Sequence, residues 1–211
     1  MISSYQRVTW LKVIYYLIIA YFSYLMVLIT LQYIPLDFKV AFLKIKQQEI
    51  QLKHYQIAFF THVYTSIIVH FAGITQFSSY LRRKFTATHR YLGFIYVAGV
   101  LFFASPSGLI MGYYAKGGII AQVSFSILAI LWFYFTLLAF LTAKKKDWKT
   151  HQKHMLRSYA LTLSAITLRI FKWIISNTLE LPPMDTYQIV SIAGWVVNLA
   201  TVEIYIKYKK L

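Results

Sequence analysis

The sequence predicts an all-α, polytopic transmembrane helix bundle that forms a single membrane domain over residues 1–211. Composition is the first observation behind this prediction. The chain is 59% hydrophobic and 18% aromatic, carries 13% charged residues, and has a mean hydropathy of +0.56. Soluble domains are typically about 45–50% apolar and roughly 25% charged. The second observation is that the apolar residues gather into runs long enough to cross a bilayer, separated by short basic gaps.

Six runs reach the length of about 20 apolar residues that a membrane helix needs. Pro35 ends the first run, and Pro182 and Pro183 follow the fifth, where proline cannot continue a helix. The expected spans are residues 10–34, 55–77, 91–114, 118–143, 155–179 and 189–206.

The basic residues predict the orientation. They lie before the first run, in alternate gaps and after the last run, so the positive-inside rule places both termini in the cytoplasm. The net charge of +16 is therefore a topology signal, and no basic face on a soluble module suggests nucleic-acid binding. The clustered residues are Arg7; Arg82, Arg83, Lys84 and Arg90; Lys144, Lys145, Lys146, Lys149 and Lys153; and Lys207, Lys209 and Lys210.

Two segments depart from this simple pattern. Residues 36–54 lie on the expected outer side and contain four lysines, which predicts an amphipathic helix on the outer membrane surface; a solvated loop helix is the alternative. Residues 105–108 place Pro106 and Gly108 inside the third run. A kink is the expected result, with a ligand site as the less favoured interpretation.

The most informative stretch runs through residues 151–172, HQKHMLRSYALTLSAITLRIFK. It places Arg169 far from either end of an apolar helix, where a guanidinium is costly and is expected to face protein, water or a ligand. At 100° per residue, six side chains fall within about a 60° arc of one uninterrupted helix. They are His154, Ser158, Ala165, Arg169, Lys172 and Ser176.

The histidines suggest a cofactor. His70, His89 and His154 can converge if the second, third and fifth runs pack together, with His151 one turn before His154. Imidazole suits haem iron, zinc or copper, and the chain has no cysteine to supply a thiolate. We therefore expect His70, His89, His154, Arg169 and Lys172 to bind a cofactor such as haem b. A metal site made of His70, His89, His151 and His154 is the rival, and purely structural histidines are the third interpretation.

The other polar residues inside the runs have structural interpretations. Glu203 can pair with Arg157 or Arg90, and Asn198 and Gln122 are expected to hydrogen-bond between helices. No nucleophile–base pair, phosphate-binding loop or dinucleotide fingerprint is present. The sequence therefore leaves open whether the protein is an enzyme.

Three segments carry a resemblance to a known family: HRYLGFIYV at residues 89–97, SGLIMG at 107–112, and the long run from Ile130 to Arg169 with its H..HM.RSYALT....TLR spacing. They resemble the bacterial predicted membrane proteins of domain-of-unknown-function family 2306. The resemblance covers about two-thirds of the chain. It implies a polytopic fold in a bacterial inner membrane and brings no established activity. The motif positions are His89, Arg90, Gly93, His151, His154, Arg157, Ser158 and Arg169.

Two functions follow from these observations. The first is an inner-membrane protein that holds haem b or a transition metal for electron transfer; transmembrane histidines also give a looser likeness to cytochrome b561-type haem proteins. The second is a non-enzymatic membrane subunit or transporter in which Arg169 and Lys172 bind an anionic group and the histidines are structural. The expected partners are the lipid bilayer, other membrane proteins or further copies of the chain, and no nucleic acid.

Overall fold

The computed structural model describes the backbone of residues 4–209 and the side chains of residues 10, 13, 14 and 16–209. Over this range every regular element is a helix, and no strand is present. Contacts divide the chain into two compact units, which meet between Gln47 and Gln48. The single domain expected from the sequence stays a prediction.

The first unit contains α1 (Ser4–Leu31) and the short 3₁₀-helix η1 (Ala41–Ile45). The turn between them is closed locally: the Phe42 N–H donates to the Tyr33 hydroxyl at 3.3 Å, and Gln47 Nε2 donates to the Phe38 carbonyl at 2.7 Å. The amphipathic helix predicted over residues 36–54 is wrong. This segment forms η1 and a second 3₁₀-helix, η2 (Glu49–Gln51), because tight turns interrupt it.

The second unit contains the candidate membrane spans. Four are long and apolar enough to cross a bilayer: α2 (Lys53–Gln76), residues 86–113, α6 (Gly118–Lys144) and α9 (Pro183–Tyr208). A fifth is the pair α7 (Trp148–Thr162) and α8 (Ser164–Thr178), which bends by 41° at Leu163. These elements match five of the six predicted runs, whereas the predicted six-span count and cytoplasmic termini stay predictions.

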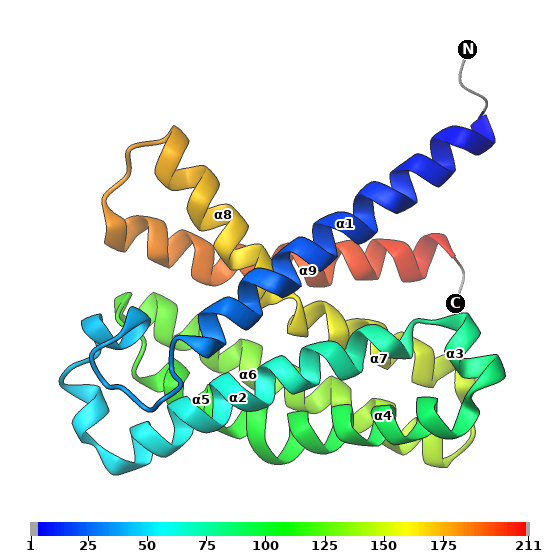
Figure 1. Cartoon of the computed structure of the whole chain (residues 1–211), viewed down its shortest axis with the longest axis horizontal. Coiled ribbons are helices and arrows are strands. Elements are labelled where there is room, and N and C mark those ends of the chain that lie inside the picture. Colours follow the sequence, from blue (N-terminus) through cyan, green and yellow to red (C-terminus); the bar gives the residue numbers. More distant parts are fainter. Residues whose placement is uncertain (1–3, 210–211) are drawn as a thin grey trace. The chain divides into compact units, whose positions relative to one another are not determined.

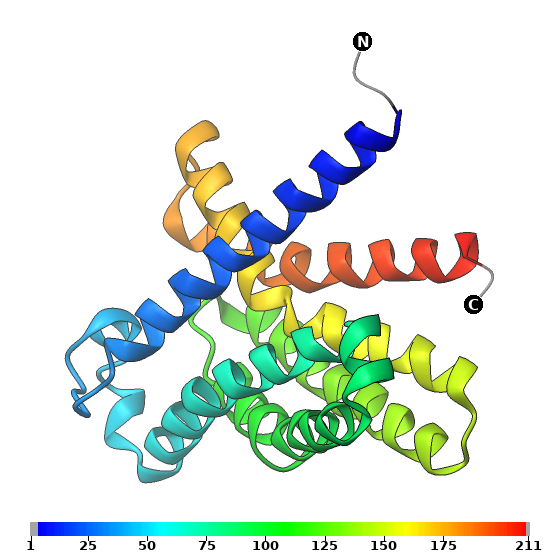
Figure 2. The same cartoon turned by 45° about the vertical axis from the view of Figure 1, so that its right-hand side comes forward.

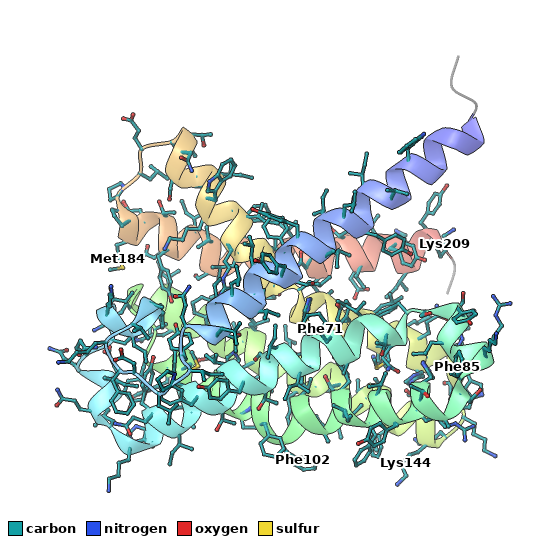
Figure 3. All side chains as sticks on the ribbon, viewed as in Figure 1. Phe71, Phe85, Phe102, Lys144, Met184 and Lys209 are labelled. Carbon is teal, nitrogen blue, oxygen red and sulfur yellow. The ribbon has the colours of Figure 1, made fainter. Side chains whose placement is uncertain are left out.

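Figures 1 and 2 show α2 and α6 lying beside the helix of residues 86–113, α7 lying beside α6, and α8 lying beside α9. The short helix α3 (Ser79–Lys84) connects α2 to the span of residues 86–113. The Ser78 hydroxyl caps α3 by accepting from the Leu81 N–H at 3.1 Å. Large apolar side chains cover the outside: Phe102 is 72% exposed and points away from the bundle (Figure 3). An apolar exterior of this kind suits contact with lipid.

The span of residues 86–113 changes its helical form midway. It is α4 (Thr86–Ala98), then the π-helix η3 (Gly99–Ala104), then α5 (Ser105–Tyr113), with the Ser105 N–H donating to the Val100 carbonyl. Pro106 has no N–H to continue an α-helical ladder, and a π-helical turn absorbs the mismatch. Where the sequence predicted a kink, the structure has a π-helical turn within a continuous span.

The break between α7 and α8 corrects the expectation of one uninterrupted helix over residues 155–179. Asn198 of α9 spans the break: Nδ2 donates to the Ala160 carbonyl at 3.1 Å, and Oδ1 accepts from the Thr167 hydroxyl at 2.9 Å. One amide therefore binds both halves of the bent pair, as expected for an interhelical hydrogen-bonder. The polar face predicted from His154 to Ser176 is split between α7 and α8 because of this bend.

Close packing of α2 against α4 and α7 depends on Gly73. A Cβ atom built at Gly73 would lie 2.5 Å from Tyr159 Cε2 and 2.9 Å from Tyr96 Cε2, and both rings are buried. These contacts are too short for real carbon atoms, so the rings would have to move.

We expect Gly73→Ala to lower the stability by about 1–3 kcal/mol, since overpacking a filled core forces side chains off their preferred rotamers. Thermal unfolding of the purified protein in detergent measures this. Gly93→Ala is the matched control: its Cβ would meet Gln76 Oε1 at 2.9 Å, the end of a flexible side chain that can move aside. Equal effects of the two substitutions would contradict the packing argument.

Candidate functional site

A buried hydroxyl network joins α4, α6 and α7 at the centre of the bundle. The Tyr96 hydroxyl lies 2.7 Å from Ser158 Oγ and 2.9 Å from Thr162 Oγ1. Tyr96 and Ser158 are both fully buried. Their positions follow from helical spacing, because Ser158 and Thr162 are four residues apart on one face of α7.

Helix α6 completes the network. The Thr136 hydroxyl lies 2.6 Å from Ser158 Oγ and donates to the Trp132 carbonyl at the same distance. The Trp132 indole N–H donates to Thr162 Oγ1 at 3.1 Å. Every hydroxyl of this network therefore has a partner, which is the condition for a stable polar group in an apolar interior.

His70 of α2 packs against Tyr159, the residue that follows Ser158 on α7. His70 is 5% exposed and its ring stacks on that of Tyr159, with 6.3 Å between ring centroids and 14° between planes. The Tyr159 ring in turn lies 5.0 Å from the Phe77 ring, measured between centroids. The role of His70 as a haem or metal ligand, expected from the sequence, stays a prediction.

The other three predicted histidines lie near the start of α7. His151 donates through Nδ1 to the Ala139 carbonyl at 2.8 Å, and His154 stacks on Phe135 at 6.2 Å. His89 of α4 lies close enough to His151 for electrostatic interaction. Among the residues that the structure describes, neither His89 Nδ1 nor His154 Nδ1 has a hydrogen-bond partner, and both atoms are buried. Figure 3 labels Lys144 and Phe85 at this end of the bundle, where α6 ends and α4 begins.

Capping and an ion pair fix the start of α7. Asp147 accepts from the Thr150 N–H at 3.1 Å, and hydrogen bonds from the Thr150 hydroxyl and N–H hold the pKa of this exposed carboxyl below its usual value. One turn past His154, Arg157 binds Glu203 of α9 through Nε at 2.5 Å and Nη2 at 2.9 Å. This confirms the predicted pairing of Glu203 with Arg157.

The metal site expected from the sequence stays a prediction. Among residues 4–209, no group of three or more histidine, cysteine, aspartate or glutamate side chains has a geometry that could hold a metal ion. The described part of the chain therefore gives haem or metal binding no support.

Arg169 and Lys172 lie elsewhere, on α8. Both are exposed and stand one turn apart on this otherwise apolar helix. Arg169 Nη1 donates to the Ala165 carbonyl at 2.6 Å, so the guanidinium folds back toward the start of α8. The cofactor set His70, His89, His154, Arg169 and Lys172 is thus divided between α2, α4, α7 and α8.

His62 of α2 contacts the span of residues 86–113. It is partly buried and donates through Nδ1 to the Ala104 carbonyl at 2.8 Å. The carbonyl that it binds is the last of the π-helix η3, and Ser107 Oγ lies 3.4 Å from the same nitrogen.

Sequence reasoning also missed the hydroxyl network. Ser158 was on the predicted polar face, but nothing in the sequence singled out Tyr96, Thr136 and Trp132. The available signal was spacing: two hydroxyl residues, Ser158 and Thr162, recur at i and i+4 in one helix and need partners if that face is buried.

The helices, their apolar exterior and the internally satisfied polar groups define an α-helical integral membrane protein. The chain belongs to the family described as Predicted membrane protein (DUF2306), whose model matches residues 59–206, well over half of the chain. This confirms the resemblance found in the sequence. No curated protein and no solved structure matches the chain, and nothing in these comparisons supports the likeness to cytochrome b561-type proteins.

We expect Tyr96→Phe to cost about 1–3 kcal/mol of stability, because Ser158 and Thr162 would each lose a partner inside the core. Thermal unfolding in detergent measures the change. Tyr91→Phe on the same helix is the control, since Tyr91 is 67% exposed and should tolerate the loss of its hydroxyl. A Tyr96 variant as stable as the Tyr91 variant would sink this account of the network.

Proposed function

We propose that this protein is a non-enzymatic membrane protein, a subunit or transporter of the bacterial cytoplasmic membrane, that binds an anionic group on α8 through Arg169 and Lys172. In this proposal the histidines stabilise the helix bundle and hold no haem or metal. Both termini face the cytoplasm, as the positive-inside rule predicts.

The observation that carries the proposal is the position of the two cations. Arg169 and Lys172 are exposed on an apolar helix that, together with α7, is long enough to be a bent membrane span. A charged side chain at the centre of a membrane helix costs about 2.5–3.5 kcal/mol on insertion scales, so such residues commonly mark a binding site. Two cations one turn apart suit a carboxylate or a phosphate.

The contacts of the histidines support a structural role. His62 and His151 each donate to a backbone carbonyl of a neighbouring helix, His70 and His154 stack on aromatic rings, and His54 pairs with the Tyr114 hydroxyl at 2.8 Å. Hydrogen bonds of this kind typically contribute about 1 kcal/mol or less within membranes, yet they orient helices. A packing role therefore accounts for these residues without a cofactor.

We expect the double variant Arg169→Gln, Lys172→Gln to bind anionic lipid at least about 100-fold more weakly than the unmodified protein, since the two charge-assisted hydrogen bonds that it loses contribute about 1.5–3 kcal/mol each. Native mass spectrometry of protein released from mixed anionic and zwitterionic nanodiscs measures the retained lipid.

Arg83→Gln, Lys84→Gln is the matched control. Arg83 is also exposed, and its guanidinium, like that of Arg169, donates to the carbonyl four residues earlier in its own helix. Unlike Arg169, Arg83 lies on the short helix α3. Equal retention of anionic lipid by both double variants would contradict a binding site on α8.

The haem or metal hypothesis stays a prediction with its own measurement. On the proposed function, the purified protein should show no Soret band and no stoichiometric transition metal. A reducible Soret band that disappears in His70→Ala or His154→Ala would overturn the structural interpretation of the histidines.

A further inference from the structure

The bend at Leu163 has no usual cause in its own sequence. The pair α7 and α8 bends by 41° there, yet residues 148–178 contain neither proline nor glycine. Sharp bends in helices come mainly from these two residues, or from a side chain that inserts into the ladder of backbone hydrogen bonds. The cause of this bend therefore has to be sought in the side chains around the ladder.

Side chains enter the ladder at the Ala160 carbonyl. In a continuous α-helix this oxygen would accept from the Ser164 N–H, four residues later. Here it accepts from Asn198 Nδ2 of α9 at 3.1 Å and from Ser164 Oγ at 3.4 Å. A carbonyl oxygen has two lone pairs, and these two side-chain donors occupy both. The Asn198 amide and a continuous helix therefore compete for one acceptor.

The same amide also holds the first turn of α8. The Thr167 hydroxyl donates to Asn198 Oδ1 at 2.9 Å. Gly194, one turn before Asn198 on α9, lies directly against α8: a Cβ atom built there would be 3.0 Å from Leu168 Cβ and 3.2 Å from its Cα. The start of α8 is therefore seated on α9 by one hydrogen bond and one close backbone approach.

Neighbouring helices fix α9, whereas the far half of α8 has little to hold it. The Trp195 indole N–H donates to Ser124 Oγ of α6 at 2.9 Å, and Glu203 binds Arg157 of α7. The far half of α8 is mostly exposed, as Trp173 is at 70%. A segment with few buried contacts takes the position that its attached end gives it. The direction of α8 is therefore decided at its first turn.

We propose that Asn198 is a latch that sets the bend of this span. With its amide bound to Ala160 the span is bent; without it, the Ser164 N–H takes the carbonyl, and α7 and α8 straighten toward one helix. The latched state is favoured because a released amide would leave two hydrogen bonds unmade in an apolar environment. The latch concerns the shape of the span and holds whatever ligand α8 binds.

The test measures a distance across the bend. The chain has no cysteine, so Lys149→Cys and Ser176→Cys place a spin label at one exposed position on each side. At a rise of 1.5 Å per residue, these positions are about 41 Å apart on a straight helix and about 38 Å apart across a bend of 41°. Pulsed electron–electron double resonance on the full-length protein in nanodiscs measures this distance. We expect Asn198→Leu to lengthen it by about 3 Å.

Gln188→Leu is the matched control. Its amide also lies on α9 and donates to a backbone carbonyl, that of Gly117 at 3.0 Å, but it is nearer the start of α9. This variant should keep the distance of the unmodified protein. Thr167→Val keeps the side-chain shape and removes only the hydroxyl bound to Asn198, so it should give a smaller lengthening. Thermal unfolding of each variant identifies those that fold.

The outcomes separate the latch from other causes of the bend. An unchanged distance in Asn198→Leu and Thr167→Val, or in whichever of them folds, overturns the proposal. A lengthening just as large in Gln188→Leu overturns the specific role of Asn198. A distance of about 41 Å already in the unmodified protein overturns the latched state. Lipid binding by the α8 variants decides the proposed function alone.

Discussion

The absence of water in a bilayer is the constraint on which this structure depends, because a buried polar group without a partner is costly there. The contact between the Tyr96 hydroxyl and Ser158 meets this requirement at the point where α4 and α7 approach, and Thr136 extends it to α6. Asn198 meets it where α7 bends into α8. The same side chains that satisfy one another also specify which helices are neighbours, so polar pairing and bundle architecture have one origin.

The sequence predicted the helical class and five matching runs well, since apolar length and prolines such as Pro182 are local signals. It did not predict the bend at Leu163. That bend interrupts an apolar stretch without proline or glycine, and the partner that spans it, Asn198, lies far along the chain. The short turns over residues 36–54 were also missed, because a pattern of alternating lysines and apolar residues suits a long helix and a series of compact turns equally.

The candidate site residues could be chosen one by one from the sequence, whereas their grouping required the fold. Arg169 was singled out because an arginine in an apolar run is anomalous wherever the helix lies. The grouping of His70 with His89 and His154 depended on an assumed packing of three helices, which no local pattern in the sequence specifies. In the bundle the His70 ring stacks on that of Tyr159, a contact between α2 and α7 that arises only from tertiary packing.

The π-helix η3 has a consequence for the two halves of its span. Tyr96 and Ser105 are nine residues apart, so a regular α-helix would turn them to opposite sides, roughly 180° from each other. Both nevertheless reach inward, Tyr96 to α7 and Ser105 to the Ala129 carbonyl of α6 at 2.8 Å. The π-helical turn changes the rotation between α4 and α5, so that side chains of both helices face the bundle. Removing a single residue from this turn would hardly shorten the span, but it would rotate one of the two helices away from its neighbours.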